Sequence, residues 1–403
     1  MSVKQSTVPH KPDSAPPKAH MHFWNNPVYR GWFVQAVLVL ITLYLGYSAF
    51  LNTVFNMKAH GIPTDLGFLP TASGFDITQS PIEYSAVNSY GRAFLVGLLN
   101  TLIVGAVGVV LTTGLGFTVG IARLSKNWII SKFAAIYIET LRNTPLLLQL
   151  LFIYNAVLKS LPGPKQSIIL PGGAFLNNRG LILPTPIFNN GASFIGFALG
   201  LGVLTSLAYA KWASMRKIRT GQDSPVGRVA ACMIILVPVI VYFAAGMPVS
   251  LEFPVLKGFN FSGGYQLYPE FVALTGGLVL YTAAFIAEIV RAGILAVSKG
   301  QSEAAGALGL NRRQTLKLIV IPQAMRVIIP PLTSQYLNLV KNSTLAIFIG
   351  YPELAQVFMG TVLNQTGAAV QCVTITMLVY LMISLTTSVF MNFYNSRKTL
   401  VER

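Results

Sequence analysis

GWFVQAVLVLITLYLGYSAFL (residues 31–51) contains no charged side chain and is apolar along most of its length. A helix that crosses a bilayer needs about 20 such residues, so this stretch is long enough to span one. It is also longer than the apolar part of a cleavable signal peptide, so we expect an uncleaved anchor. Seven further apolar runs follow, at residues 93–121, 133–158, 194–210, 229–247, 271–295, 323–350 and 371–394. The pattern predicts an all-α, polytopic membrane protein with about eight transmembrane helices.

The composition favours a membrane protein and argues against a nucleic-acid binder. Of the 403 residues, 53% are hydrophobic and 10% are charged, whereas soluble domains are about 25% charged. Lys and Arg number 29 against 12 Asp and Glu, for a net charge of +17. If the N-terminus is cytoplasmic, eight spans return the C-terminus to the cytoplasm, and most basic residues then lie in short cytoplasmic segments. The charge therefore orients the chain and predicts no nucleic-acid partner.

The apolar runs form two blocks with an insertion between them. Cys232 and Cys372 both fall in apolar runs, so we expect no structural disulfide. The histidines have no acidic or cysteine cluster beside them, so we expect no metal site. The expected order is a cytoplasmic tail (1–30), an extra first span (31–51), an outer loop (52–91), a first core block (92–160), an insertion with two spans and outer loops (161–267), a second core block (268–396) and a cytoplasmic tail (397–403).

The loop SKGQSEAAGALGLNRRQTLKLIVIP (residues 298–322) is predicted to fold as two short helices. Ser298 and Asn311 are each followed by Gln three residues later, which is the pattern of a capping box. Gly309 stands where a helix ends with a left-handed residue. Pro322 suits the opening of the next span, because the first helical turn needs no N–H donor there. Such an element projects an alanine-rich surface suited to docking in a groove of another protein.

The spacing within this loop resembles the EAA loop of ABC importer permeases. The matching residues are Glu303-Ala304-Ala305, Gly309, and Ile319 with Ile321-Pro322, where Ile321 replaces the usual leucine. This resemblance implies a type I permease fold with a cytoplasmic helix that couples to an ATPase. The residues expected in that coupling loop are Glu303, Ala304, Ala305, Gly309, Arg312, Arg313 and Pro322.

Other segments look like polar amino-acid permeases of the His/Gln/Glu/Arg group. They are ETLRNTPLLLQLLFIYN (139–155), YTAAFIAEIVRAGI (281–294), PQAMRVIIPPLTSQYLNLVKNSTL (322–345) and IGYPEL (349–354). The extra first span and the middle pair resemble the longer permease subunits of general L-amino-acid uptake systems. The resemblance implies a bacterial inner-membrane subunit that works with a second permease subunit, a cytoplasmic ATPase dimer and a periplasmic amino-acid-binding protein, and that moves polar L-amino acids.

The chain is expected to hydrolyse no ATP itself. It contains no Gly-Lys pair, and so no phosphate-binding loop of the Gly-Lys-Ser/Thr type. We therefore expect ATP and Mg in the partner ATPase and no cofactor in this chain. A self-sufficient secondary amino-acid transporter or channel is the alternative, and an integral membrane enzyme is a third class, for which no acid–base or metal constellation is visible.

Ionisable residues in the apolar runs are candidates for the substrate pathway. Glu139 with Arg142, and Glu288 with Arg291, share a spacing that places each pair on one helix face. Each pair either contacts substrate or neutralises itself near the cytoplasmic end of its span.

Two polar interruptions are further candidates. Arg142-Asn143-Thr144-Pro145 predicts a helix start with Thr144 as the cap, and Lys341-Asn342-Ser343-Thr344 has a similar order. A helix start inside a membrane protein is able to hold a substrate carboxylate. Packing between two permease chains is the alternative. The repeats Gly116-x-x-x-Gly120 and Gly196-x-x-x-Gly200 allow close approach of helices.

Overall fold

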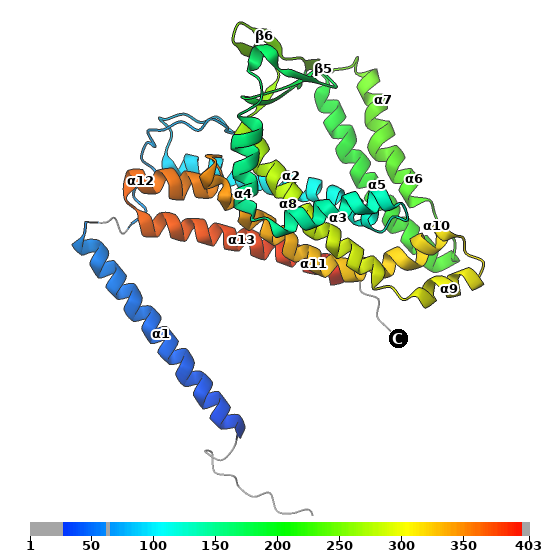
Figure 1. The fold of residues 1–403 in the computed structure, drawn as a ribbon, viewed down its shortest axis with the longest axis horizontal. Coiled ribbons are helices and arrows are strands. Elements are labelled where there is room, and N and C mark those ends of the chain that lie inside the picture. The colour runs from blue at the N-terminus through cyan, green and yellow to red at the C-terminus, as the bar shows by residue number, and fades with distance from the viewer. Residues whose placement is uncertain (1–26, 62–64, 397–403) are drawn as a thin grey trace, which may run out of the picture. The chain divides into compact units, whose positions relative to one another are not determined.

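The computed structural model describes residues 27–61 and 65–396, which fall into two compact units divided after Leu66. In the first unit the described structure is one helix, α1 (Pro27–Ala59), which contains the predicted first span and extends it at both ends (Figure 1). The rest of the predicted N-terminal tail (1–26) and the predicted tail 397–403 lie outside the described residues.

Five helices form the core of the second unit. They are α2 (Tyr90–Arg123), α3 (Trp128–Asn143), α8 (Pro269–Leu295), α11 (Ile321–Asn342) and α13 (Ala369–Ser396). Helix α8 is central, because it packs against α2, α3 and α11, and α11 packs in turn against α13. In the described part of the chain, seven helices are long and apolar enough to cross a membrane. The predicted all-α membrane fold is therefore confirmed.

One predicted span, residues 133–158, is wrong as a single helix. Helix α3 ends at Asn143, and the chain restarts as α4 (Leu146–Leu151) and a π-helical segment, η2 (Phe152–Leu158). Pro145 has no N–H group and disfavours a helical residue before it, so the helix breaks here. The break places polar backbone groups in the middle of an apolar run.

Short strands occupy the outer segments of the insertion, where the sequence indicated only turns. Strand β3 pairs with β2 on one side and with β8 on the other, so strands from opposite ends of the insertion share one sheet. Strand β1 pairs with β2, β4 with β5, and β6 with β7, all antiparallel. Their bounds are β1 (Ile168–Leu170), β2 (Ala174–Asn177), β3 (Gly180–Leu183), β4 (Thr185–Phe188), β5 (Val249–Glu252), β6 (Val255–Lys257), β7 (Asn260–Ser262) and β8 (Tyr265–Leu267).

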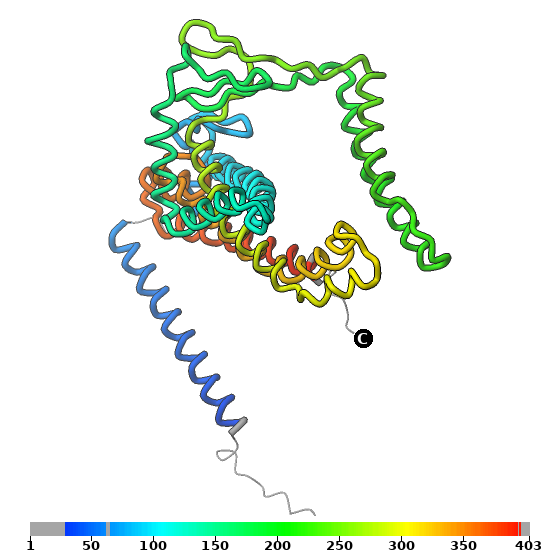
Figure 2. The backbone as a smooth tube through the Cα atoms, turned by 45° about the vertical axis from the view of Figure 1, so that its right-hand side comes forward, coloured from blue at the N-terminus to red at the C-terminus, as the bar shows by residue number. Residues whose placement is uncertain are grey.

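The two spans predicted inside the insertion form a helical hairpin. Helix α5 (Ala192–Thr220) packs against a second arm made of α6 (Val226–Ala231), η4 (Cys232–Leu236) and α7 (Val237–Ala244). The two arms run side by side in Figure 2, where the strands connect them to the rest of the unit. Gly202 lies at their contact, since a methyl group added there would come 2.4 Å from the Met233 carbonyl oxygen.

The α2–α8 contact depends on the first of the two glycine repeats. A methyl group added at Gly116 would lie 2.6 Å from Ile286 Cγ2, and one added at Gly120 would lie 2.7 Å from the Ala287 carbonyl oxygen. A Cβ carbon does not come this close to a non-bonded heavy atom, so the helices approach as closely as they do only because both side chains are hydrogen. At Gly196 and Gly200 an added methyl group meets nothing within 4 Å. Only the first repeat is a packing site within this chain.

We predict that Gly120→Ala destabilises the protein and that Gly200→Ala does not. The added methyl group at position 120 would push against the α8 backbone, and overpacking of this kind costs about 1–3 kcal/mol. Thermal unfolding of the detergent-solubilised protein measures the difference. Equal melting temperatures for the two variants would contradict the role of Gly120.

Candidate functional site

The loop between α8 and α11 contains a helix that ends in a left-handed glycine, as predicted. Helix α9 (Lys299–Ala307) is followed by Gly309, which has φ of 77°. The Gly309 N–H donates to the Gly306 carbonyl at 2.9 Å, and the Leu310 N–H donates to the Ala305 carbonyl at 3.0 Å. This pair of hydrogen bonds is the Schellman motif, which satisfies carbonyls that the helix end leaves unpaired. The turn therefore has a fixed geometry and reverses the chain sharply.

One of the two predicted capping boxes forms. At the start of α10 (Arg312–Thr315), Asn311 Oδ1 accepts from the Gln314 N–H at 3.0 Å, and Gln314 Oε1 accepts from the Asn311 N–H at 2.9 Å. The box predicted at Ser298 does not form, because the Ser298 side chain makes no cap bond. Instead, Gln301 Oε1 accepts from Gln323 Nε2 at 3.3 Å. That contact ties α9 to the first turn of α11.

Pro322 occupies the second position of α11, but the helix does not begin there. A π-helical turn, η5 (Leu316–Val320), joins α10 to α11, so the helical run extends from Arg312 to Phe348. A proline inside a helix cannot donate to the carbonyl four residues before it, and a wider turn relieves the clash of its ring. The run connects the loop directly to the core.

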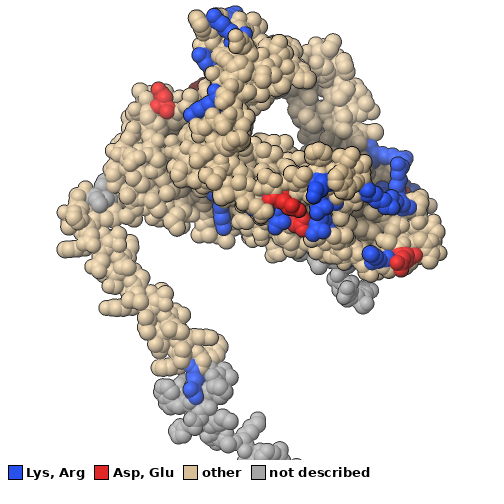
Figure 3. Space-filling view, in the orientation of Figure 1, with Lys and Arg blue, Asp and Glu red and all other residues tan. Residues whose placement is uncertain are grey.

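The outer face of α9 is exposed. Ala305 is 1% exposed and packs inward, whereas Glu303 and Ala304 face outward. Leu308, at the end of the helix, is 80% exposed, an apolar side chain without cover in this chain. Arg312 and Arg313 are also exposed, and Figure 3 shows basic side chains over this end of the second unit. The loop thus presents a small surface with an apolar tip and mixed charge.

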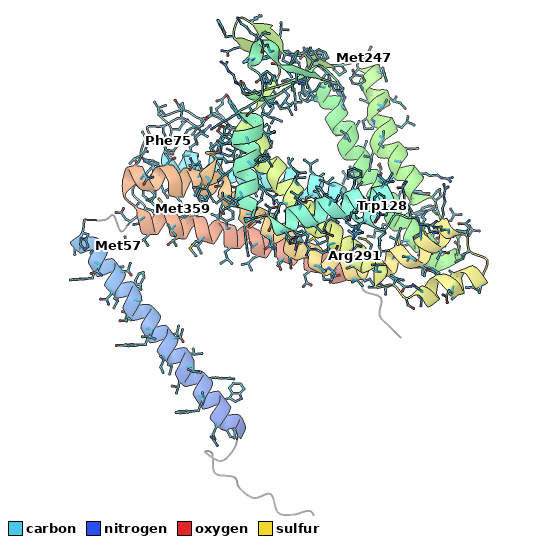
Figure 4. All side chains as sticks on the ribbon, in the orientation of Figure 1. Met57, Phe75, Trp128, Met247, Arg291 and Met359 are labelled. Atoms are coloured by element: carbon cyan, nitrogen blue, oxygen red, sulfur yellow. The ribbon has the colours of Figure 1, made fainter. Side chains whose placement is uncertain are left out.

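The structure brings together three of the candidate pathway residues, where α3 meets α8. Arg291 donates to Glu288 in an ion pair of 2.6 Å, so this pair neutralises itself. The Arg142 guanidinium lies 5.1 Å from the centre of the Phe285 ring, which is three residues before Glu288 on α8. Figure 4 labels Arg291 on α8, toward the end that leads into α9. Glu139 and Arg142 form no ion pair in the described part of the chain.

The break between α3 and α4 is closed by a residue that the sequence analysis missed. The Thr144 hydroxyl donates back to the Thr140 carbonyl and does not cap α4, so the predicted cap is wrong. Gln149 bridges the gap instead, because its Nε2 donates to the Leu141 carbonyl at 2.9 Å and to the Thr144 carbonyl at 3.0 Å. The available sequence signal was Gln149 itself, a polar side chain four residues after Pro145 in an otherwise apolar run.

The second interruption lies where α11 ends at Asn342 and a 3₁₀ helix, η6 (Ser343–Phe348), begins. Ser343 is fully buried, and its hydroxyl donates to the Val340 carbonyl at 2.7 Å. The Thr344 hydroxyl donates to the Lys341 carbonyl at 2.8 Å. The side chains of Lys341 and Asn342 make no hydrogen bond or ion pair with any other described residue. Ala346 and Leu146 belong to one apolar cluster, so the two interruptions flank the same part of the core.

Glu353 is a buried acid that the sequence analysis did not single out. It precedes η7 (Gln356–Val362) and α12 (Leu363–Thr366), between two candidate spans, and is fully buried. Its Oε1 accepts from the Gln356 N–H at 2.8 Å, and its Oε2 accepts from the Thr101 hydroxyl at 3.3 Å and from the Tyr380 hydroxyl. Burial raises the pKa of this carboxyl above its ordinary 4.5, although the hydrogen bonds act in the opposite direction. The residue joins α2, α13 and the segment before η7.

Comparison with protein families identifies the chain. Residues 112–400 match the binding-protein-dependent transport system inner membrane component family. The chain belongs to this family. The match covers α3, α8, α11, α13, the C-terminal part of α2 and the α9–α10 loop, so the predicted class of ABC importer permease is confirmed.

Relatives of this permease match it over most of their length. The putative amino-acid ABC transporter permease protein YhdX of Escherichia coli K12 is 49% identical over all of both chains. The general L-amino acid transport system permease protein AapQ of Rhizobium johnstonii is 46% identical over 94% of each chain. The glutamate/glutamine/aspartate/asparagine transport system permease protein BztB of Rhodobacter capsulatus is 38% identical over 93% of this chain and 95% of that protein. The insertion and first span therefore belong to this group of long permeases.

We predict that Gly309→Ala deforms the loop of the permease and that Gly306→Ala does not. An L-residue at the φ of Gly309 costs about 1–2 kcal/mol, whereas an added methyl group at Gly306, inside α9, meets nothing within 4 Å. Hydrogen exchange of the Gly309 and Leu310 amides reports the change. Unaltered exchange in Gly309→Ala would contradict the assigned turn.

Proposed function

We propose that this permease is the membrane-spanning subunit of an ATP-driven importer that moves L-amino acids, with polar ones favoured, from a periplasmic binding protein into the cytoplasm. The observation that carries the proposal is the family match together with amino-acid transport in the names of the relatives that align over nearly the whole chain. The proposed assembly contains a second permease subunit and a cytoplasmic ATPase dimer, which binds ATP and Mg. Both termini face the cytoplasm, and the membrane is the bacterial inner membrane.

The α9–α10 loop is the proposed docking site for the ATPase. Glu303 and Ala304 offer the outer face of α9, and Leu308 is an apolar anchor for a groove. Arg312 and Arg313 meet acidic side chains or lipid headgroups. The Schellman turn at Gly309 holds this surface in one shape, so docking loses little conformational entropy.

Movement of the ATPase reaches the spans along two connections. The helical run from Arg312 to Asn342 continues from α10 through η5 into α11, so a displacement of α10 is carried into α11. The Gln301–Gln323 hydrogen bond adds a direct link from α9 to α11. Because α11 packs against both α8 and α13, a tilt of α11 changes the spacing between the core helices.

The proposed substrate pathway follows the two polar interruptions and the cluster near α8. It includes Arg142, Asn143 and Thr144 from one interruption, and Lys341, Asn342, Ser343 and Thr344 from the other. Glu288 and Arg291 complete the set. The side chains of Lys341 and Asn342 are the strongest candidates for substrate contact, since they make no hydrogen bond or ion pair with any other described residue. Ser343 is buried and supports the turn.

We predict that Glu303→Lys lowers ATP-dependent uptake by the complex. Reversing the charge on the outer face of α9 opposes docking of the ATPase, and unfavourable charge contacts at interfaces cost several kcal/mol. The measurement is ATP-dependent amino-acid uptake by the assembled complex in proteoliposomes. Asp223→Lys is the control, because Asp223 is an exposed acid on the α5–α6 connection.

Full uptake by the Glu303→Lys complex would overturn the coupling role. Uptake by this permease without any ATPase would instead favour the self-sufficient carrier or channel.

We predict that Lys341→Met raises the half-saturating amino-acid concentration about tenfold, since a hydrogen bond to a charged group contributes about 1.5 kcal/mol or more. Lys341→Arg keeps the positive charge and retains most of the affinity. Lys132→Met, at an exposed cation in the α3 helix, is the control. If Lys341 only packs against the second permease, Met and Arg at this position would lower the yield of intact complex without a selective change in affinity.

A further inference from the structure

A polar cavity of about 360 Å³ lies beside the N-terminal end of α8. Its walls come from four segments that are distant in the sequence: the loop before α2, the β2–β3 turn, the start of α8 and the loop after η6. Thr78, Arg179, Glu270 and Tyr351 represent these four segments. All four fall on the outer side of the membrane in the proposed orientation. The volume is within the range of small-molecule sites.

The insertion contributes Arg179, the one basic residue among the lining residues. The Arg179 carbonyl accepts from Gln266 Nε2 at 2.8 Å, and its guanidinium donates to the Phe259 carbonyl at 3.2 Å and to Asn260 Oδ1. The next residue, Gly180, has φ of 116°, and a methyl group there would lie 2.0 Å from the Leu267 carbonyl oxygen. The turn is thus pressed against the segment that opens α8, and the Arg179 guanidinium is held by Phe259 and Asn260 at the edge of the cavity.

Two buried polar atoms of lining residues have no hydrogen-bond partner in the described structure. They are Gln79 Oε1 and the Tyr351 hydroxyl, and their side chains are 9% and 0% exposed. Leaving such atoms unpaired costs about 1–3 kcal/mol each, so a ligand that pairs with them binds more tightly. Asn100 Nδ2 donates to both the Gln79 and the Pro352 carbonyls, at 2.8 Å each, and so fixes two walls relative to each other.

The charges of the cavity are complementary to a zwitterion. Arg179, the one basic lining residue, favours a carboxylate. Glu270, which is half-buried and accepts from the Tyr154 hydroxyl at 2.7 Å, favours an ammonium group. Gln79 Oε1 accepts hydrogen bonds, so an amide N–H on a side chain suits it better than a carboxylate does.

We propose that this cavity binds a polar L-amino acid at the outer face of the permease, before the substrate enters the pathway between the spans. The inference rests on the proposed function, because it assumes an amino-acid substrate. It gives the insertion a role, since Arg179 is supplied by the insertion and the other charge, Glu270, by the core.

Thiol protection in the assembled complex tests the proposal. In a Cys232→Ser background, Thr78→Cys places a thiol on the cavity wall, while Cys372 is buried. L-Glutamine is the probe, and a membrane-impermeant thiosulfonate is the label. Saturating L-glutamine is expected to slow labelling about tenfold, since a site that is about nine-tenths occupied is open about one-tenth of the time. N-acetyl-L-glutamine lacks the ammonium charge and is expected to give no protection.

Matched variants separate the cavity from its surroundings. Thr71→Cys is an exposed position in the same loop and outside the cavity, and its labelling is expected to be unaffected by L-glutamine. Glu270→Gln is expected to abolish protection of Thr78→Cys. Glu83→Gln changes an exposed acid five residues after Thr78 and outside the cavity, and is expected to leave the protection unchanged. If Thr78→Cys does not assemble, Asn178→Cys on another wall takes its place.

Equal labelling of Thr78→Cys with and without L-glutamine would overturn the cavity as a binding site. ATP-dependent uptake is measured on the same complex. Amino-acid uptake without protection rejects the cavity alone, whereas a complex that imports no L-amino acid rejects the proposed function.

Discussion

The close approach of α2 and α8 at Gly116 and Gly120 is the contact on which the rest of the core depends. In a bilayer, apolar side chains gain little by leaving lipid, so helices associate through tight packing and polar contacts. These two glycines, one helical turn apart, let the α2 backbone approach Ile286 and the Ala287 carbonyl of α8. Helices α3 and α11 then pack on α8, and α13 on α11. Because α8 leads directly into α9, the same contact also sets the position from which the α9–α10 loop projects.

Local rules predicted much of the geometry of the α9–α10 loop, because that geometry is made by neighbouring residues. The left-handed turn at Gly309 and the capping box at Asn311 each involve residues within five positions of one another. The box predicted at Ser298 failed for a tertiary reason, since Gln301 pairs with Gln323 on another helix. The break at Pro145 was visible as a motif, but the apolar residues on both sides made the run look continuous.

The remaining site features depend on partners that a sequence does not reveal. Gly116 and Gly196 begin the same four-residue spacing, yet one meets Ile286 and the other meets open space. Glu353 is bound by Thr101 and Tyr380, which are distant along the chain. The cavity beside the start of α8 combines four segments, and it forms only when β3 pairs with β8. None of these residues carries a local signal that distinguishes it from its unpartnered counterparts.

The pairing of β3 with β8 has a consequence for how such a chain can vary. Leu183 lies opposite Tyr265, so the chain leaves the sheet and rejoins it at neighbouring positions. Antiparallel strands with this geometry can be joined by a connection as short as two residues. The hairpin of α5 to α7 therefore lies within a connection whose two ends, β3 and β8, are already paired with each other. A change in the length of this hairpin would leave the paired ends of β3 and β8 in place.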